Sequence, residues 1–413
     1  MSKLFKRVAA FTLAATMGLG LVACGSSSAG GDSAVNNASN TSEGSTAKEF
    51  VIGNAQPLTG VNAQVGDSAN KAANLAVKYI NEHGGFNGAT VRLVNYDDQG
   101  SPEEAVKIAT KMIQSDKVDA VLGSLTSTCV LAAGKYYNDA KLVTFGTGNS
   151  PTWMEQGWEY IFRAGLNTGL SMPFLTAKMA DLGIKSVSVF QGLDDAAKTS
   201  AEAFVAACKE NGIEVLTVES YTEGDTDYSG QVAKIISTNP EVVFCSTNGP
   251  TQAIFAKQLR QLGYDGLAFN REGLTADTIS VAGDASNYWS FVYPYVTYTS
   301  PDEAEDPDMQ EFLQMFYDEY GEMPYHDCAY RSWDALMTLA EAARIAGSND
   351  SDAIREAVGQ IKDFKVLGGV LDFTAGTGEG LNTLNTYIVI DGKYTDFDAW
   401  YEAGGYDELK ASK

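Results

Sequence analysis

The chain has 413 residues, of which 44% are hydrophobic, and its formal net charge is −24 at pH 7. So acidic a chain is a poor partner for nucleic acid, whose phosphates favour proteins rich in lysine and arginine. The length is sufficient for two domains, each with its own hydrophobic core.

The N-terminus has the three regions of an export signal in order. Three cations precede an apolar, alanine-rich run, which is too short for a membrane span but suits a signal-peptide core. The run ends in Leu21-Val22-Ala23-Cys24, the bacterial lipobox pattern, in which the cysteine receives a diacylglycerol. We therefore predict a signal peptide over 1–23 and a lipoprotein, with palmitate among its lipid chains, anchored through Cys24. The alternative is an ordinary secretory signal with a chance cysteine.

The next segment has the composition of a tether. Residues 25–48 are mostly glycine, serine, alanine, asparagine and threonine, and few are large apolar residues. Such a segment cannot bury enough surface to offset its chain entropy. We predict that 24–48 is the lipidated cysteine with a flexible linker that holds a globular body away from the membrane.

From residue 49 onward, short apolar strands alternate with helical segments, and the alternation occurs twice. Continuous apolar strands between helices predict parallel sheets covered on both faces. The sequence therefore predicts an α/β protein with two lobes. Strands are expected near 50–53, 91–94, 118–122, 142–145, 187–190, 215–218, 242–245, 266–269, 288–298, 370–373 and 386–390. Helices are expected near 67–83, 101 onward, 128 onward, 170–182, 196–211, 229–238, 251–262, 307–320, 327–346 and 351–361.

Motifs for catalysis are absent from the sequence. There are only two histidines, and there is no H-E-x-x-H, G-x-S-x-G or Walker sequence. Gly146-Thr147-Gly148 follows a strand but lacks the third glycine of a dinucleotide-binding fingerprint. We expect no enzyme, no catalytic residue, no metal and no cofactor.

The remaining cysteines have no motif spacing. None forms a C-x-x-C pair, and their wide separation favours small buried apolar residues over a metal cluster or a disulfide framework. Whether any pair is bridged stays open at this point. These cysteines are Cys129, Cys208, Cys245 and Cys328.

Three loops follow strands at the sheet edge where open α/β sheets place ligands. The first is the hydroxyl-rich loop 123–128, where free N–H groups at a helix start favour an anion; plain N-capping is the alternative. The second is 146–151. The third is Arg271-Glu272-Gly273, whose carboxylate suits a ligand cation, with a surface Arg–Glu pair as the alternative.

Residues 50–413 resemble the leucine/isoleucine/valine-binding family of importer receptors. The resemblance is carried by segments in the same order along most of the chain. These are Pro57-Leu58-Thr59-Gly60, Ile80-Asn81-Glu82-His83-Gly84-Gly85-Phe86-Asn87-Gly88, Tyr96-Asp97-Asp98-Gln99, Asp116-Lys117-Val118-Asp119-Ala120-Val121-Leu122-Gly123-Ser124 and Glu272-Gly273-Leu274. The resemblance implies a type I two-lobed clamshell with three hinge crossings and no catalysis.

The resemblance also implies how an amino-acid ligand is held. Its α-carboxylate would bind Ser127, the backbone of Thr147, and Asn149, where the family often has threonine. Its α-ammonium would bind Glu272. The side-chain pocket departs from the family, because Val65, Ala196 and Asn248 stand where aromatic residues are common. This polar, thinned wall disfavours leucine-like specificity, and Tyr228 and Tyr330 are candidates for replacement walls.

We therefore expect an extracytoplasmic, membrane-anchored solute-binding lipoprotein of an ABC importer. It would bind an amino acid or a related small polar solute and dock, as a monomer, on a permease. Alternatives are a sensory module for a signalling partner and the same receptor role for an amide or a small organic acid. Lobe 1 is expected over 49–165 and 297–367, and lobe 2 over 166–296 and 368–413.

Overall fold

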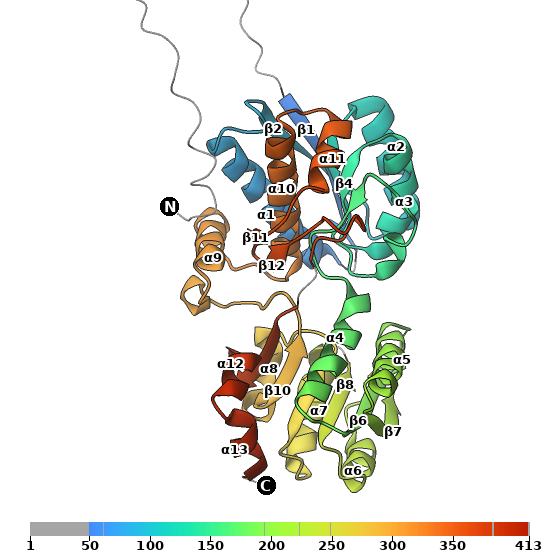
Figure 1. The fold of residues 1–413 in the computed structure, drawn as a ribbon, viewed down its shortest axis with the longest axis vertical. Helices are drawn as coiled ribbons and strands as arrows, with labels where there is room; N and C mark the ends of the chain where they lie inside the picture. Colours follow the sequence, from blue (N-terminus) through green and yellow to red (C-terminus); the bar gives the residue numbers. More distant parts are fainter. Residues whose placement is uncertain are drawn as a thin grey trace, which may run out of the picture. The chain divides into compact units, whose positions relative to one another are not determined.

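The computed structural model describes residues 49–60, 62–193, 195–222, 224–247, 249–381 and 384–411. Cys24, the predicted signal peptide, the tether and Asn248 lie outside the described residues. Within 49–411 the chain forms two sheets, each the centre of one lobe, as the alternating pattern predicted (Figure 1).

The sheet of lobe 1 is entirely parallel. Its strand order is β2-β1-β3-β4-β5, so the first strand lies inside the sheet and the chain winds outward from it. The strands are β1 (Glu49–Gln56), β2 (Thr90–Asp97), β3 (Ala120–Leu122), β4 (Val143–Phe145) and β5 (Ile161–Phe162).

Helices cover both faces of this sheet (Figure 1). One layer packs through a core cluster that includes Met112, Val130 and Trp153, while α1 packs against α10 in the other. The helices are α1 (Ala63–Glu82), α2 (Pro102–Lys111), η1 (Met112–Asp116), α3 (Ser127–Asp139), η2 (Pro151–Trp153), η4 (Pro301–Glu303), α9 (Pro307–Tyr320), α10 (Cys328–Ala346) and α11 (Ser351–Val358).

The sheet of lobe 2 has the order β14-β13-β10-β9-β8-β6-β7. Strands β6 to β10 are parallel, and the C-terminal hairpin β13–β14 adds antiparallel strands beside β10. The strands are β6 (Ser186–Gly192), β7 (Glu214–Tyr221), β8 (Val242–Ser246), β9 (Leu267–Asn270), β10 (Trp289–Val292), β13 (Thr386–Ile390) and β14 (Lys393–Asp396).

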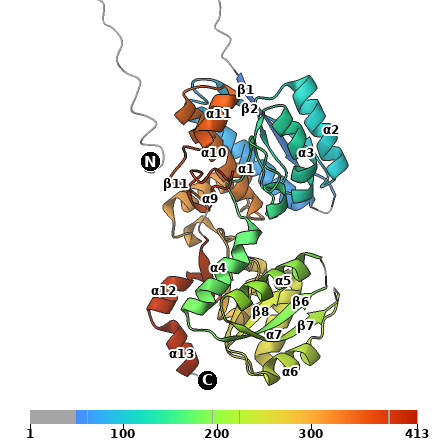
Figure 2. The same cartoon turned by 45° about the vertical axis from the view of Figure 1, so that its right-hand side comes forward.

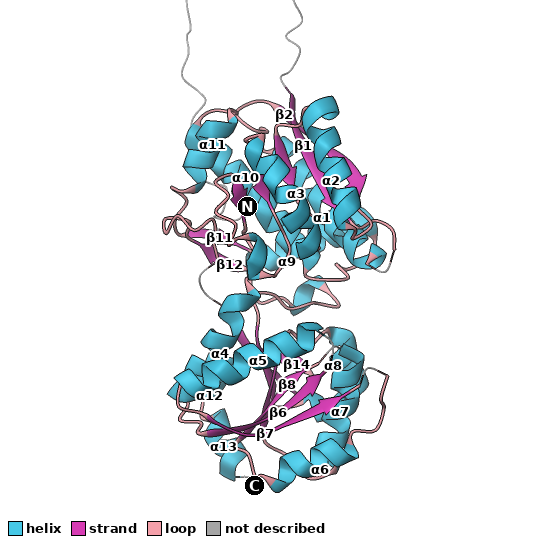
Figure 3. Ribbon diagram, turned by 90° about the vertical axis from the view of Figure 1, so that its right-hand side faces the viewer, coloured by secondary structure: helices cyan, strands magenta, loops and turns pink. Residues whose placement is uncertain are grey.

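Helices also flank the second sheet (Figures 2 and 3). Helix α4 packs on α5, and α7 packs on α6 and α8. The helices are α4 (Thr168–Asp181), α5 (Asp195–Glu210), α6 (Ser229–Ser237), α7 (Gly249–Gln261), α8 (Ala276–Ala282), η3 (Gly283–Ser286), α12 (Phe397–Glu402) and α13 (Gly405–Ala411). The chain passes between the lobes three times: from β5 to α4, from β10 to α9, and from β12 (Gly369–Leu371) to β13.

The tyrosine-rich segment 288–298 differs from its prediction as one long strand. Only Trp289–Val292 forms β10. Pro294 has no backbone N–H to give to a ladder, so pairing ends before it. The tyrosines beyond it belong to the second crossing between the lobes.

The expected return to lobe 2 at residue 368 is also wrong in its position. Strands β11 (Phe364–Val366) and β12 (Gly369–Leu371) form a separate hairpin, and the chain then packs on lobe 1. Phe373 contacts Phe145 edge to face, and Glu379 pairs with the fully buried Arg163. The physical reason is that a buried guanidinium requires a carboxylate partner, and Glu379 provides it.

The four cysteines Cys129, Cys208, Cys245 and Cys328 are free and buried, as the spacing favoured. Burial raises the pKa of the thiols of Cys129, Cys208 and Cys245 to about 12, so these three are inert neutral side chains at physiological pH. Among the described residues, no helix has the length and apolar character needed to cross a bilayer.

Candidate functional site

The two predicted carboxylate-binding loops lie side by side in lobe 1. Ser127 begins α3 just after β3, and its Oγ accepts a hydrogen bond from the Ser150 N–H at 3.1 Å. Thr147 follows β4, and its N–H donates to the Ser124 carbonyl at 3.3 Å. These contacts arise because parallel β3 and β4 end at the same sheet edge. The structure therefore brings Ser127, Thr147 and Asn149 together.

Glycine at 148 is required by this close approach of the two loops. A Cβ added there would lie 2.5 Å from the Ser127 Oγ. Thr147 beside it is 2% exposed, and its Oγ1 has no hydrogen-bond partner among the described residues. An unpartnered buried hydroxyl at this edge is a candidate donor to a bound anion.

Arg331 of α10 is hydrogen-bonded to the loop after β4. The sequence did not predict a role for this residue. It is 4% exposed, and its Nη1 donates to the Thr147 carbonyl and, at 2.7 Å, to Asn149 Oδ1. Asp327 lies one helical turn earlier, with its Oδ2 3.1 Å from Arg331 Nε. Burial disfavours the charged guanidinium, but Asp327 raises its pKa, so the pair is ionised.

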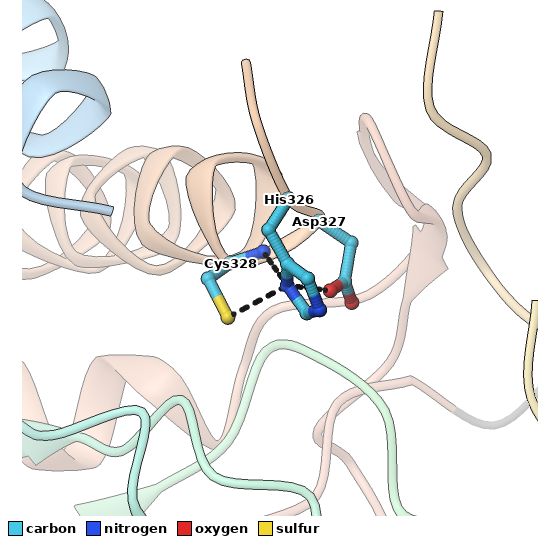
Figure 4. A group of neighbouring side chains, drawn as sticks. All are labelled: His326, Asp327 and Cys328. Carbon is cyan, nitrogen blue, oxygen red and sulfur yellow. Dashed lines mark hydrogen bonds and ion pairs between the residues drawn. The ribbon is translucent and has the colours of Figure 1, made fainter. Parts of the chain in front are cut away.

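Asp327 also organises the residues around the N-terminus of α10 (Figure 4). His326 Nδ1 lies 2.6 Å from Asp327 Oδ1 and 3.1 Å from Cys328 Sγ. Burial opposes protonation of His326, yet the adjacent Asp327 carboxylate raises its pKa well above the usual value. In return, and against the effect of burial, Arg331 and His326 lower the pKa of Asp327.

The donor atoms of His326, Asp327 and Cys328 all lie within 4.8 Å of one another, as in some metal sites. However, Arg331 already pairs with Asp327, and its Nη2 lies 2.7 Å from Cys328 Sγ. A guanidinium in this position repels a second cation. We therefore assign these residues to the polar network of the site and not to a metal centre.

A polar cavity of about 200 Å³ lies next to this network. Lobe 2 and the second crossing line most of it, and α10 closes it through His326 and Asp327. Its walls are Thr247, Gln252, Asn270, Glu272, Gly273, Leu274, Thr275, Tyr293, Tyr295, Val296, Thr297, His326 and Asp327. Tyr293 connects the crossing to lobe 1, because its hydroxyl donates to Asp327 Oδ2 at 2.9 Å.

Among the predicted ligand residues whose side chains the structure describes, Glu272 alone lines this cavity. Its side chain is 50% exposed, and Oε1 lies 3.2 Å from Arg271 Nη2, so the Arg–Glu pair weighed from the sequence also forms. Asp327 is already neutralised by Arg331 and His326, so Glu272 is the carboxylate of this lining that remains half exposed. Its charge suits a ligand cation such as an ammonium group.

Only part of the predicted side-chain pocket is formed by residues whose side chains the structure describes. Val65 lies half-buried in the first turn of α1 and does not line the cavity. Ala196 is in the first turn of α5, and its side chain, like Asn248, lies outside the described residues. Tyr228 and Tyr330, candidates for pocket walls or for core tyrosines, are fully buried in the core. Tyr293 and Tyr295 line the cavity.

Tyr295 connects the second crossing to another buried carboxylate of α10. Its hydroxyl donates to Asp334 Oδ2 at 2.9 Å, and Asp334 also accepts from the backbone N–H groups of Leu367 and Gly368, each at 2.9 Å. Burial raises the pKa of Asp334 to about 7, although these donors oppose the shift. Because the folded state binds this proton more tightly than the unfolded state, its contribution to stability is complete at acid pH and is lost as the pH rises through about 7.

The raised pKa of Asp334 predicts that the difference in stability between the wild type and Asp334→Asn depends on pH. The advantage of the wild type over Asp334→Asn in the free energy of unfolding should fall as pH rises from about 4 to about 7, by up to about 1.4 kcal/mol per pH unit. Urea unfolding at a series of pH values measures it. A difference that stays constant from pH 4 to 8 would contradict the assignment.

Two parallel α/β lobes, three crossings and a polar cavity lined from both lobes define a type I two-lobed solute receptor. Residues 49–393 match the model of the periplasmic binding protein family. The chain therefore belongs to this family of exported solute receptors, which are not enzymes.

Relatives and solved structures agree with this class. The chain is 27% identical over 368 residues to the Leu/Ile/Val-binding protein homolog 1 of Brucella abortus, with 85% of this chain and 94% of that protein covered. It superposes, at 23% identity and a TM-score of 0.67, on the branched-chain amino acid transporter substrate-binding protein of Streptococcus pneumoniae solved with isoleucine, covering 84% and 98% of the two chains. A solute-binding protein of an ABC transporter from R. palustris, solved with benzoate, superposes at 19% identity and a TM-score of 0.65, with 84% and 95% covered.

Proposed function

We propose that this protein is the lipid-anchored receptor of an ATP-driven (ABC) importer and that it binds an amino acid or a closely related small polar solute between its lobes. The observation that carries the proposal is that groups suited to bind an anion lie near groups suited to bind a cation. Hydroxyl groups and an arginine-held loop gather at one strand edge, and Glu272 and Asp327 line the neighbouring cavity. A zwitterion needs both kinds of partner.

In this proposal the ligand carboxylate binds the loops after β3 and β4. Ser127 and Thr147 offer hydroxyl groups, and the amide of Asn149 is held in place by Arg331. Arg331 is a positioning residue, since its N–H groups are directed to Thr147, Asn149 and Asp327. The ligand ammonium binds Glu272, and Tyr293 completes the wall next to it. Contacts from both lobes to one solute would favour the closed over the open arrangement.

The relatives support this proposal and also supply its alternative. The Brucella relative is named for leucine, isoleucine and valine, and the pneumococcal structure holds isoleucine. The R. palustris structure holds benzoate, which has a carboxylate but no ammonium. The second candidate is therefore the same receptor role for a small organic acid, or for an amide, and a third is a sensory module that reports a solute to a signalling partner.

Calorimetric titration of the purified chain with the common L-amino acids, benzoate and other small carboxylates tests the proposal. We expect saturable binding of at least one amino acid. Binding of a carboxylate without an ammonium group, and of no amino acid, would replace the amino-acid proposal by the organic-acid alternative.

The lipid anchor predicts the location of the protein. Cys24→Ala should move the chain from the membrane fraction to the soluble extracytoplasmic fraction or the medium, with its solute affinity unchanged, because the anchor is separated from the body by the proposed tether. A tethered receptor meets its permease at a high effective concentration, so uptake should fall even though binding does not. Immunoblotting of cell fractions measures the change.

The matched control is Cys208→Ala, which removes a buried thiol of α5 and should leave the chain in the membrane fraction. Persistence of the Cys24→Ala chain in the membrane fraction would overturn the anchor assignment.

A further inference from the structure

Two amide side chains in the cavity have polar atoms without partners. Gln252 of α7 is 2% exposed, and Asn270 at the end of β9 is 1% exposed. Gln252 Nε2, a donor, and Asn270 Oδ1, an acceptor, have no hydrogen-bond partner in the described part of the chain. Both residues line the same cavity as Glu272.

The orientation of Asn270 is fixed by its neighbour. Its Nδ2 donates to the Glu272 carbonyl at 2.9 Å. The reverse orientation would place two acceptor oxygens against each other, so Oδ1 is the atom left without a partner among the described residues. Asn270 is thereby connected directly to the residue proposed to bind the ligand ammonium.

Unpartnered buried amide atoms are costly, because folding removes their hydrogen bonds to water without replacing them. Most buried polar groups in proteins have partners, so a donor and an acceptor left in one cavity of about 200 Å³ point to a bound molecule that supplies both. A branched aliphatic side chain supplies neither. A carboxylate cannot donate to Asn270 Oδ1 and is repelled by Glu272, and an ammonium group cannot accept from Gln252.

We propose that the solute carries a neutral group that both donates and accepts a hydrogen bond, a carboxamide or a hydroxyl, and that Gln252 and Asn270 bind this group. The inference rests on the proposed function and narrows it to a polar, uncharged amino-acid side chain. It agrees with the polar residue that the sequence has at position 248.

Matched ligand pairs test the proposal on the unmodified protein. Threonine and valine have nearly the same shape, as do asparagine and leucine, and glutamine is close in length to methionine. In calorimetric titrations of the purified chain, the polar member of at least one pair should bind about 10- to 100-fold more tightly. Apolar members that bind as tightly as their partners in all three pairs would overturn the inference and leave the proposed function intact. The absence of binding by any amino acid would instead overturn the proposed function.

A variant of Gln252 tests whether the preference for the polar ligand comes from the amide of this residue. Gln252→Leu removes the unpartnered donor at similar volume and breaks none of the hydrogen bonds found in the structure. The polar ligand should then bind about 10-fold or more weakly, while binding of its apolar counterpart changes by less than about 3-fold. An equal loss for both ligands would contradict a specific contact.

The control is Ser171→Ala, which removes a buried hydroxyl that has no partner among the described residues. Ser171 lies on α4, away from the cavity walls. The substitution should leave both affinities unchanged. Near-identical thermal unfolding of the two variants would show that the change in selectivity of Gln252→Leu does not come from a loss of folded protein.

Discussion

Replacing Arg331 by methionine should lower the free energy of unfolding by about 3–5 kcal/mol, because the substitution removes the guanidinium partner of a buried carboxylate and leaves it only His326. Asp327 is 5% exposed and has its Oδ2 3.1 Å from Arg331 Nε. The same substitution removes the donors to Thr147 and Asn149, so the loop after β4 loses its support. Solute affinity should therefore fall as well, in the protein that remains folded.

Urea unfolding followed by circular dichroism measures the first effect, and calorimetry measures the second. Arg344→Met is the matched control, since it is the same substitution on the same helix, in a pair with Glu341 whose arginine side chain is 49% exposed. It should cost at most about 1 kcal/mol. The double variant Asp327→Asn with Arg331→Met should recover part of the loss. Equal destabilisation by Arg331→Met and Arg344→Met would refute the buried pair.

Glu272→Gln should weaken amino-acid binding by about 10- to 150-fold, which corresponds to the loss of a charge-assisted hydrogen bond of about 1.5–3 kcal/mol. Glutamine keeps the size of the side chain but removes the charge that an ammonium requires. Stability should fall only modestly, because the Glu272 side chain is 50% exposed, although its partner Arg271 is 6% exposed and loses a carboxylate. Calorimetry with the best ligand of the wild type measures the loss.

The control for net charge is Glu202→Gln on the exposed side of α5, which should bind the ligand as the wild type does. A second readout is the ligand itself. An analogue without the α-amino group should lose affinity for the wild type but not for Glu272→Gln. Equal affinity of Glu272→Gln and wild type for the amino acid would remove Glu272 from the site.

The sequence was sufficient for the architecture because apolar strands and capped helices are local signals. Ser101 was expected to start a helix, and its Oγ accepts from the Glu104 N–H at 3.4 Å. The short helices α12 and α13 were missed, since Gly404-Gly405 interrupts a weak pattern. Residues 369–381 were assigned to the wrong lobe because the attraction between Arg163 and Glu379 acts between positions far apart in the chain.

The sequence indicated those residues of the proposed site that follow strands, and it did not indicate those at the start of helix α10. Ser127, Thr147 and Glu272 follow strands, so topology alone brings them to the ligand edge. The sequence predicted a helix near 327–346, which contains Asp327 and Arg331, but no function for either residue. A signal was present, because Asp327, Arg331 and Asp334 recur at spacings of four and three residues, which places them on one face of the helix. Charges on such a face must find partners inside the protein.

The order of the strands has a consequence for how the polypeptide reaches its final state. The lobe 2 sheet needs β13 and β14 beside β10, and lobe 1 needs α10 packed on α1, so both cores draw on the last third of the sequence. Neither core can close during the passage of an exported chain until most of its length has emerged. We therefore expect the long-range contacts that close both cores to form late in folding.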